Sequence, residues 1–186
     1  MSTAHKVIPI LAMLSLITGA RAEDRPFHVE ANVGRSSVDD IDGLSIDDAA
    51  TAFRLETGYR FFDWLGVAGA FVDLGTIESS VEITPGALAP VKASADGFEV
   101  TVVGRAELTE KWAIAAHAGM LWWTGDASIN GVVNSDSGND STWGIGAEYE
   151  LKQAIVLTAG RRRYVVDDID VDAAYLGVMV RFGDTE

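Results

Sequence analysis

The sequence has 186 residues, 28 of them acidic and 14 basic, and it contains no cysteine. The absence of cysteine excludes a disulfide framework and thiolate chemistry. The formal net charge of −14 opposes binding to nucleic acid, because such binding depends on basic groups that neutralise phosphates. We therefore expect no nucleic-acid partner.

The first residues have the features of an export signal. Lys6 precedes the apolar run Val7–Leu16, and Ala20-Arg21-Ala22 has the small-residue pattern of a cleavage site. The run is shorter than the roughly 20 apolar residues of a spanning helix, so a retained anchor is the weaker alternative. We expect a signal peptide over residues 1–22 and one outer-membrane β-barrel domain over residues 23–186.

Apolar and polar residues alternate with period two along eight later segments, which predicts eight strands. The first segment places Phe27, Val29, Ala31 and Val33 on one face. The other segments cover, in chain order, residues 53–61, 64–74, 98–108, 112–122, 143–150, 155–163 and 175–182.

The predicted connections alternate in length. Short turns fall at residues 62–63, 109–111 and 152–153, and long loops cover residues 37–49, 76–96, 124–141 and 166–172. In outer-membrane barrels the short turns face the periplasm and the long loops face outward. The pattern predicts an all-β protein, an eight-stranded antiparallel up-and-down transmembrane β-barrel with both termini in the periplasm.

The same alternation would suit a soluble barrel with its faces exchanged. Aromatic residues at both strand ends of the apolar face favour a membrane, as do glycines on the polar face, which leave room in a narrow lumen. The charges of the polar face nearly balance, as buried charges must. We therefore predict a lumen charge network. Its members are Glu30, Arg54, Glu56, Arg60, Glu99, Arg105, Glu107, His117, Glu148, Glu150, Arg162 and Arg181.

Several short motifs carry a family resemblance. They are Gly58-Tyr59-Arg60-Phe61, Val72-Asp73-Leu74-Gly75, Gly97-Phe98 through Gly104-Arg105, Gly144-x-Gly146-x-Glu148-Tyr149 and the ending Gly177-Val-Met-Val-Arg-Phe182. With these pieces the chain resembles the OmpA-like and OmpX-like outer-membrane β-barrel families (porin-family small barrels). The resemblance implies the cell outer membrane and recognition by the outer-membrane assembly machinery through the C-terminal strand ending at Phe182. Gly183–Glu186 depart from the pattern, because they follow the usual terminal Phe.

Enzymatic and cofactor chemistry is not predicted. Of the two histidines beyond the expected cleavage site, His28 and His117, neither has a neighbouring serine like that of the lipid A deacylase or palmitoyltransferase barrels. No phosphate-binding loop is present, so we expect no catalytic residue and no cofactor. The carboxylate clusters at residues 39–42 and 167–172 lack the full calcium loop and its closing Glu. We expect solvated acidic loops without a metal site.

Charge distribution suggests a lipid contact. The predicted long loops hold fifteen acidic residues and one base, Lys92, so the outer rim is anionic and divalent ions could bridge it to lipopolysaccharide. Arg35, Arg161 and Arg163 are expected to point outward at the loop end of their strands, where lipid phosphates lie. We predict lipid-phosphate contacts there; the alternative is an arginine that snorkels or pairs with a loop.

The expected function follows from the narrow lumen. Eight strands enclose just enough space for side chains to fill. We therefore expect a monomeric, non-enzymatic barrel with a structural or surface-interaction role, in envelope integrity, lipopolysaccharide contact or adhesion. A narrow low-conductance channel for ions or small solutes is the alternative, and a lipid-modifying enzyme is a more distant one.

Overall fold

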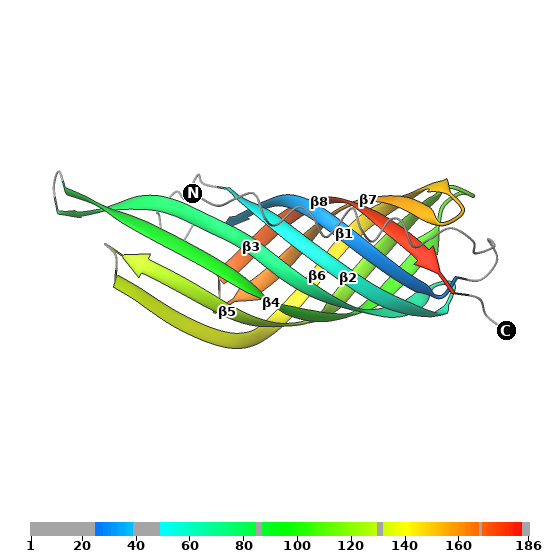
Figure 1. The fold of residues 1–186 in the computed structure, drawn as a ribbon, viewed down its shortest axis with the longest axis horizontal. Coiled ribbons are helices and arrows are strands. Elements are labelled where there is room, and N and C mark those ends of the chain that lie inside the picture. Colours follow the sequence, from blue (N-terminus) through cyan, green and yellow to red (C-terminus); the bar gives the residue numbers. More distant parts are fainter. Residues whose placement is uncertain (1–24, 39–48, 85–86, 130–131, 168, 184–186) are drawn as a thin grey trace.

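The computed structural model describes residues 25–38, 49–84, 87–129, 132–167 and 169–183, and the expected signal peptide lies outside them. The strands are β1 (Phe27–Val38), β2 (Ala50–Phe62), β3 (Leu65–Thr84), β4 (Ala87–Glu107), β5 (Trp112–Ile129), β6 (Val132–Lys152), β7 (Ile155–Val166) and β8 (Ile169–Phe182). Each strand pairs antiparallel with its neighbours in sequence, and β1 pairs with β8 to close the barrel (Figure 1). The predicted eight-stranded up-and-down barrel is confirmed. Within the described residues, no helix is both long and apolar enough to cross a membrane.

Three short turns lie together at one end of the barrel, which we call the turn end. They fall between β2 and β3, between β4 and β5, and between β6 and β7, as the sequence predicts. The described ends of the chain meet them there, because Phe27 is the register partner of Phe182 and the amide of Arg60 donates to the carbonyl of Pro26 at 2.8 Å. We call the opposite end the loop end; in outer-membrane barrels this end faces outward.

Two of the segments predicted as long loops form strands instead. Residues 76–96 and 124–141 are mostly strand, because β3–β4 and β5–β6 continue as hairpins beyond the ends of the other strands (Figure 1). The predicted loop at 166–172 is largely replaced by the start of β8 at Ile169. The lipid-facing pattern of apolar residues stops at the membrane boundary, whereas backbone pairing between strands does not depend on lipid. Apolar alternation in the sequence therefore does not predict the outer hairpins.

A bulge marks the place where β3 leaves its partner β2. The register of β3 against β4 shifts between Asp73 and Thr76, and Gly75 has φ of 79°. A side chain at Gly75 would strike the carbonyl oxygen of Thr51 on β2. Glycine is therefore required for β3 to bend away into the outer hairpin.

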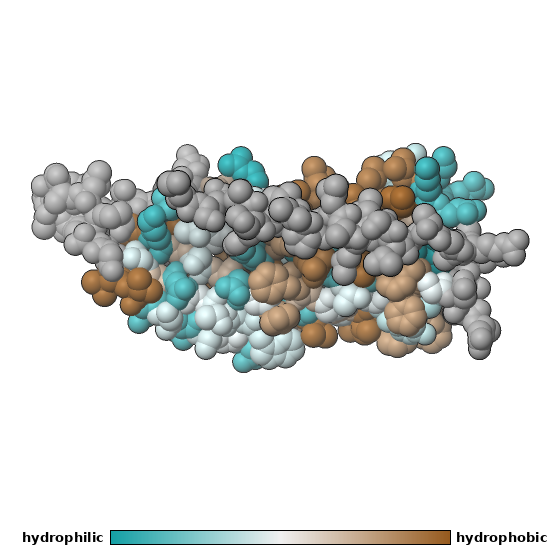
Figure 2. Space-filling view, viewed as in Figure 1, coloured by the Kyte–Doolittle hydropathy of each residue, from teal (hydrophilic) through white to brown (hydrophobic). Residues whose placement is uncertain are grey.

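The barrel has an apolar exterior and a charged interior. Phe98 and Leu176 are each 66% exposed, whereas Arg54 and Glu99 are 1% exposed. Figure 2 shows apolar side chains gathered on the outer surface of the strands. Paired aromatic rings lie on this surface near the turn end, as with Trp112 and Tyr149, whose centroids are 4.8 Å apart. A soluble barrel would have the opposite arrangement, because burying charges while exposing large apolar side chains to water is unfavourable.

Candidate functional site: the filled lumen and the outer rim

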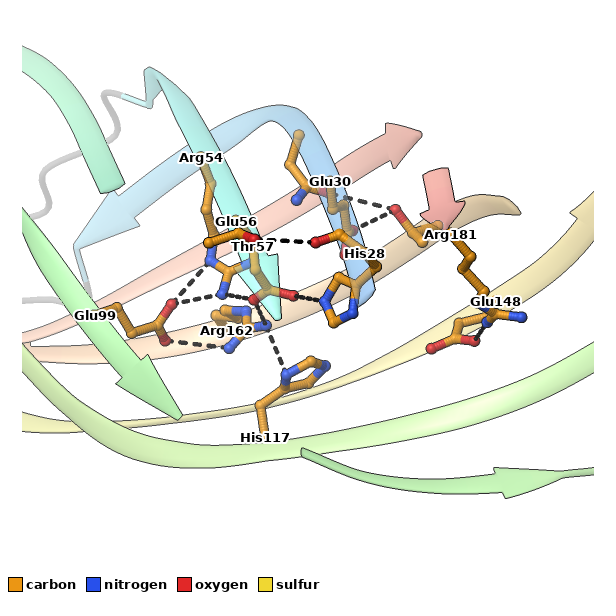
Figure 3. Close-up of polar contacts among 12 residues, drawn as sticks. His28, Glu30, Arg54, Glu56, Thr57, Glu99, His117, Glu148, Arg162 and Arg181 are labelled. Carbon is orange, nitrogen blue, oxygen red and sulfur yellow. Dashed lines mark hydrogen bonds and ion pairs between the residues drawn. The ribbon is translucent and has the colours of Figure 1, made fainter. Parts of the chain in front are cut away.

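The lumen is built from inward-facing side chains of almost every strand. Successive residues of a strand point to opposite sides, so Arg54 and Glu56 of β2 both face inward. Glu99 of β4 and Arg162 of β7 reach the same region from other parts of the wall (Figure 3). Charged residues from distant parts of the sequence therefore meet at the centre of the barrel.

Glu99 is the central acceptor of this inner cluster. Its Oε2 accepts from Nε of Arg54 at 2.8 Å, and its Oε1 accepts from Nη1 of Arg162 at 3.1 Å and from Oγ1 of Thr142 at 3.0 Å. Arg54 also pairs with Glu56. Each buried charge in this group thus has an opposite charge and further hydrogen bonds, which makes its burial tolerable.

Both described histidines are bound within the same cluster. Nη2 of Arg162 lies 2.8 Å from Nδ1 of His117, and Nε2 of His28 lies 3.0 Å from Oε1 of Glu56 (Figure 3). A guanidinium only donates hydrogen bonds, so Nδ1 of His117 must accept. The partners of the two rings are an arginine and a glutamate, and neither is a nucleophile paired with a base.

A second cluster of charges lies nearer the turn end. Oε2 of Glu148 accepts from Nε of Arg105 at 2.9 Å and from Nη2 of Arg181 at 2.5 Å. Arg105 also pairs with Glu107 at 2.7 Å, and Arg181 lies 3.8 Å from Glu150. These contacts join strands β4, β6 and β8 across the lumen.

Glu30 differs from the other lumen acids. Its Oε1 accepts from Oγ1 of Thr158 at 2.6 Å, and among the described residues no arginine or lysine lies within ion-pair distance of it. Its direct cross-strand neighbour is Glu56, so two carboxylates face each other across β1 and β2. Like charges in this position destabilise a sheet.

Sequence reasoning missed several members of the lumen. Arg25 lies before the first predicted strand, yet it is buried, and its carbonyl oxygen accepts from Nη2 of Arg60 at 3.0 Å. No alternation pattern covers that position. Thr142 and Thr158 are uncharged, so a search for balanced charges passes over them. Thr142 lies two residues before Gly144, which is on the polar face, so period-two alternation also places Thr142 in the lumen.

The loop-end half of the lumen is apolar, whereas the sequence pattern predicts a charged lumen throughout. The buried side chains of Leu121, Trp123, Tyr164 and Tyr175 pack together there with small residues of β2, β3 and β8. Below this apolar layer, the space left around the charged clusters is a cavity of about 70 Å³. This volume holds a few water molecules.

The three predicted rim arginines differ in their surroundings. Arg35 and Arg161 are exposed and are both register partners of Ala174, so they lie on either side of β8. Arg161 has one long ion-pair contact, of 3.8 Å, with Asp172. Arg163 binds the same carboxylate through two hydrogen bonds, of 3.0 and 2.6 Å, and its guanidinium lies 5.9 Å from the Trp143 ring centre. Arg163 is thus engaged within the protein.

The structure describes only one of the two acidic clusters that were compared with a calcium loop. Residues 39–42 lie outside the described residues. In the other cluster, Asp170 and Asp172 are both paired with Arg163. In the part of the chain that the structure describes, no three acidic, histidine or cysteine side chains are grouped to hold a metal ion.

An apolar exterior, aromatic residues near the strand ends and an interior filled with ion pairs define a small outer-membrane β-barrel. A family model described as outer membrane protein beta-barrel domain matches residues 8–182. The chain belongs to this family, and its place is the bacterial outer membrane.

Solved structures show the same fold. Ail, the attachment invasion locus protein of Yersinia pestis, is 21% identical with a TM-score of 0.62, covering 86% of this chain and 100% of that one. Ail in complex with the heparin analogue sucrose octasulfate is 20% identical with a TM-score of 0.60 and the same coverage. Neisserial surface protein A is 16% identical with a TM-score of 0.58, covering 84% and 97%. Among curated proteins, no match was found.

Proposed function

We propose that the protein is a non-enzymatic barrel with a structural and surface-interaction role in the outer membrane. The observation that carries this proposal is the filled lumen, in which ion pairs are covered by an apolar layer containing Leu121 and Trp123. Because the lumen is filled, other molecules can contact only the outer wall and the extracellular surface of the barrel. We therefore assign the function to those two surfaces.

The extracellular surface is an antiparallel sheet formed by the outer parts of β3, β4, β5 and β6. Asp73 is the last β3 residue paired with β2, and Thr142 is the first β6 residue paired with β7, so among the described residues the sheet has two open edges beyond them. Open edges can accept another extended chain. Ail is an attachment invasion locus protein, which supports a contact role for this barrel as well.

The extracellular surface is negatively charged, which favours a positively charged partner. Residues 76–96 and 124–141, which form this sheet, contain six acids and one base, Lys92, and Lys92 is already paired with Glu78 at 2.5 Å. A sulfated polyanion such as the heparin analogue bound to Ail would be repelled. We propose a positively charged partner for this protein.

The outer wall is proposed to contact lipopolysaccharide. Arg35 and Arg161 are exposed on either side of the small residue Ala174, so a lipid phosphate can approach both guanidinium groups. Binding of labelled lipopolysaccharide should weaken in Arg35→Ala/Arg161→Ala and stay unchanged in the control Lys111→Ala/Lys152→Ala, which alters exposed bases at the turn end. Equal affinity in all three proteins would end the lipid proposal.

Assembly and oligomeric state are also proposals. Phe182 stacks on Phe27 at 6.0 Å, and this contact closes β8 onto β1 near the turn end. We propose that the C-terminal strand ending at Phe182 is the segment recognised by the outer-membrane assembly machinery. Because β1–β8 pairing closes the sheet on itself, no strand edge in the wall needs a second copy, and we propose a monomer.

Planar-bilayer recording tests the proposed function against the channel alternative. A filled lumen predicts no steady conductance from the folded protein. Steady steps on the order of hundreds of picosiemens would require an open water path and would favour a channel. Mass spectra of lipid A from expressing cells should be unchanged, and a new lipid A species would favour the enzyme alternative.

A further inference from the structure

The loop end of the lumen opens into a pocket above the apolar layer. This mouth pocket has a volume of about 290 Å³. Its wall is largely apolar and includes Val38, Leu74, Trp123, Val166 and Val171. The volume is close to the lower end of the range for small-molecule sites, roughly 300–1,000 Å³. The pocket is therefore about large enough for a compact ligand, and Leu74, Trp123 and Val171 of the apolar layer form part of its wall.

The aromatic side chain of the pocket is held in a fixed position. Nε1 of Trp123 donates to Oδ2 of Asp140 at 2.7 Å, and the residue is 6% exposed. Gly138 makes room for the indole, because a side chain there would come within 2.8 Å of the ring. The part of the indole that lines the pocket is therefore a fixed apolar surface.

The polar part of the pocket is negative. Asp126, Asp136 and Asp167 contribute to its lining, and no lysine or arginine of the described residues forms an ion pair with any of them. Among the described residues, the Asp126 carboxylate accepts from the Ser135 hydroxyl and the Asp136 carboxylate accepts from the Ser137 amide. These donors are uncharged, so they do not neutralise the two carboxylates. The one base of the outer segments, Lys92, is paired with Glu78.

We propose that the mouth pocket binds a small organic cation with an apolar body, of the aryl-alkyl ammonium type. The apolar wall and the Trp123 ring take up the body of the ligand, and the carboxylates of Asp126 and Asp136 attract its charge. An anion of the same shape is repelled by the same carboxylates. An uncharged molecule of the same shape has the apolar contacts alone and binds more weakly than the cation.

The test follows Trp123 by NMR. The folded protein is placed in phosphatidylcholine nanodiscs with ¹⁵N-labelled indoles, and a variant in which Trp64, Trp112, Trp122 and Trp143 are replaced by Phe assigns the Trp123 signal. The probes are 4-phenylbutylammonium, 4-phenylbutyrate and 4-phenylbutanol. We expect a saturable shift of the Trp123 signal with the ammonium probe, weaker binding of the alcohol and the weakest of the carboxylate. Raising the salt to about 0.5 M should weaken only the ammonium probe.

Matched variants separate charge from shape. Asp126→Asn/Asp136→Asn keeps the oxygen acceptors for Ser135 and Ser137, and it should weaken the ammonium probe by roughly three- to tenfold without changing the alcohol. The control Asp63→Asn/Glu110→Gln removes two exposed acids at the turn end and should change nothing. The proposal is overturned if the ammonium and carboxylate probes bind alike, if no probe saturates, or if all the indoles shift together, as expected for partition into lipid.

Discussion

Arg54 of β2 reaches across the neighbouring strand β3 to Glu99 of β4, and its Nε and Nη2 atoms lie 2.8 and 2.7 Å from the same oxygen, Oε2. Both residues are almost fully buried. Because neither charge can be solvated, each depends on the other. This pair and its neighbours fill the middle of the barrel.

Glu99→Gln should destabilise the barrel strongly. The change leaves Arg54 and Arg162 facing a neutral amide inside the lumen, and breaking a buried pair in this way costs about 3–5 kcal/mol of unfolding free energy. Urea-induced unfolding, followed by the different gel mobility of folded and unfolded barrels, measures it. A variant as stable as the parent would show that the pair is solvated.

Glu30→Gln should behave differently, although it also removes a buried lumen carboxylate. The amide oxygen can still accept from Thr158, and the repulsion from Glu56 directly across the strand pair disappears. We expect the unfolding free energy to stay the same or to rise by up to about 1 kcal/mol. A loss as large as that of Glu99→Gln in the same urea titration would contradict this description of Glu30.

Thr101→Val tests a buried hydroxyl that has no partner among the described residues. Valine has nearly the same shape, so we expect unchanged or slightly higher stability, by up to about 1 kcal/mol. The matched change Thr142→Val removes a hydrogen bond to Glu99 and should lower the unfolding free energy by about 1.5–3 kcal/mol. Equal effects of the two changes on thermal unfolding would refute the distinction.

Asp172 provides a pH-dependent prediction outside the membrane-spanning part of the barrel. Hydrogen bonds from Arg163 lower the pKa of this carboxyl below its ordinary value of 3.8. A lowered pKa in the folded state stabilises the protein above the ordinary value, and the contribution is lost as the pH falls through the folded value. Asp172→Asn should therefore unfold at a lower temperature than the parent at pH 7.

The two melting temperatures should converge as the pH drops below about 4. Glu78→Gln is the control, because Glu78 and Lys92 form a highly exposed pair, and such pairs contribute little. A difference between Asp172→Asn and the parent that stays constant down to acidic pH would mean that the carboxylate charge is not the cause.

The strand count and the faces of the barrel could be predicted because lipid imposes a strict alternation. Residues such as Phe98 and Leu176 must be apolar wherever a strand faces lipid, so the pattern is visible in the sequence alone. The outer parts of β3 to β6 lie beyond the lipid, so no lipid-facing row of apolar residues marks them in the sequence. Their strands became evident only from their pairing.

The contacts inside the lumen could be predicted only as a set. Period two shows that Arg54, Glu99 and Arg162 face inward, but which charges meet depends on the stagger between strands. The pairing of Arg163 with Asp172 depends in the same way on the register of β7 against β8. The inward Leu121 and Trp123 break the rule of a polar lumen, so charge balance did not indicate the apolar layer.

Trp122 and Trp123 test the orientation of the wall most directly, because they are adjacent in β5 and face opposite sides. Trp122 is 49% exposed on the outer face, and Trp123 is 6% exposed inside the barrel. Two single-tryptophan variants, each with the other four tryptophans replaced by Phe, are reconstituted in lipids with brominated acyl chains, which quench fluorescence on contact. We expect strong quenching of Trp122 and almost none of Trp123. Equal quenching, or stronger quenching of Trp123, would contradict a barrel whose apolar face touches lipid.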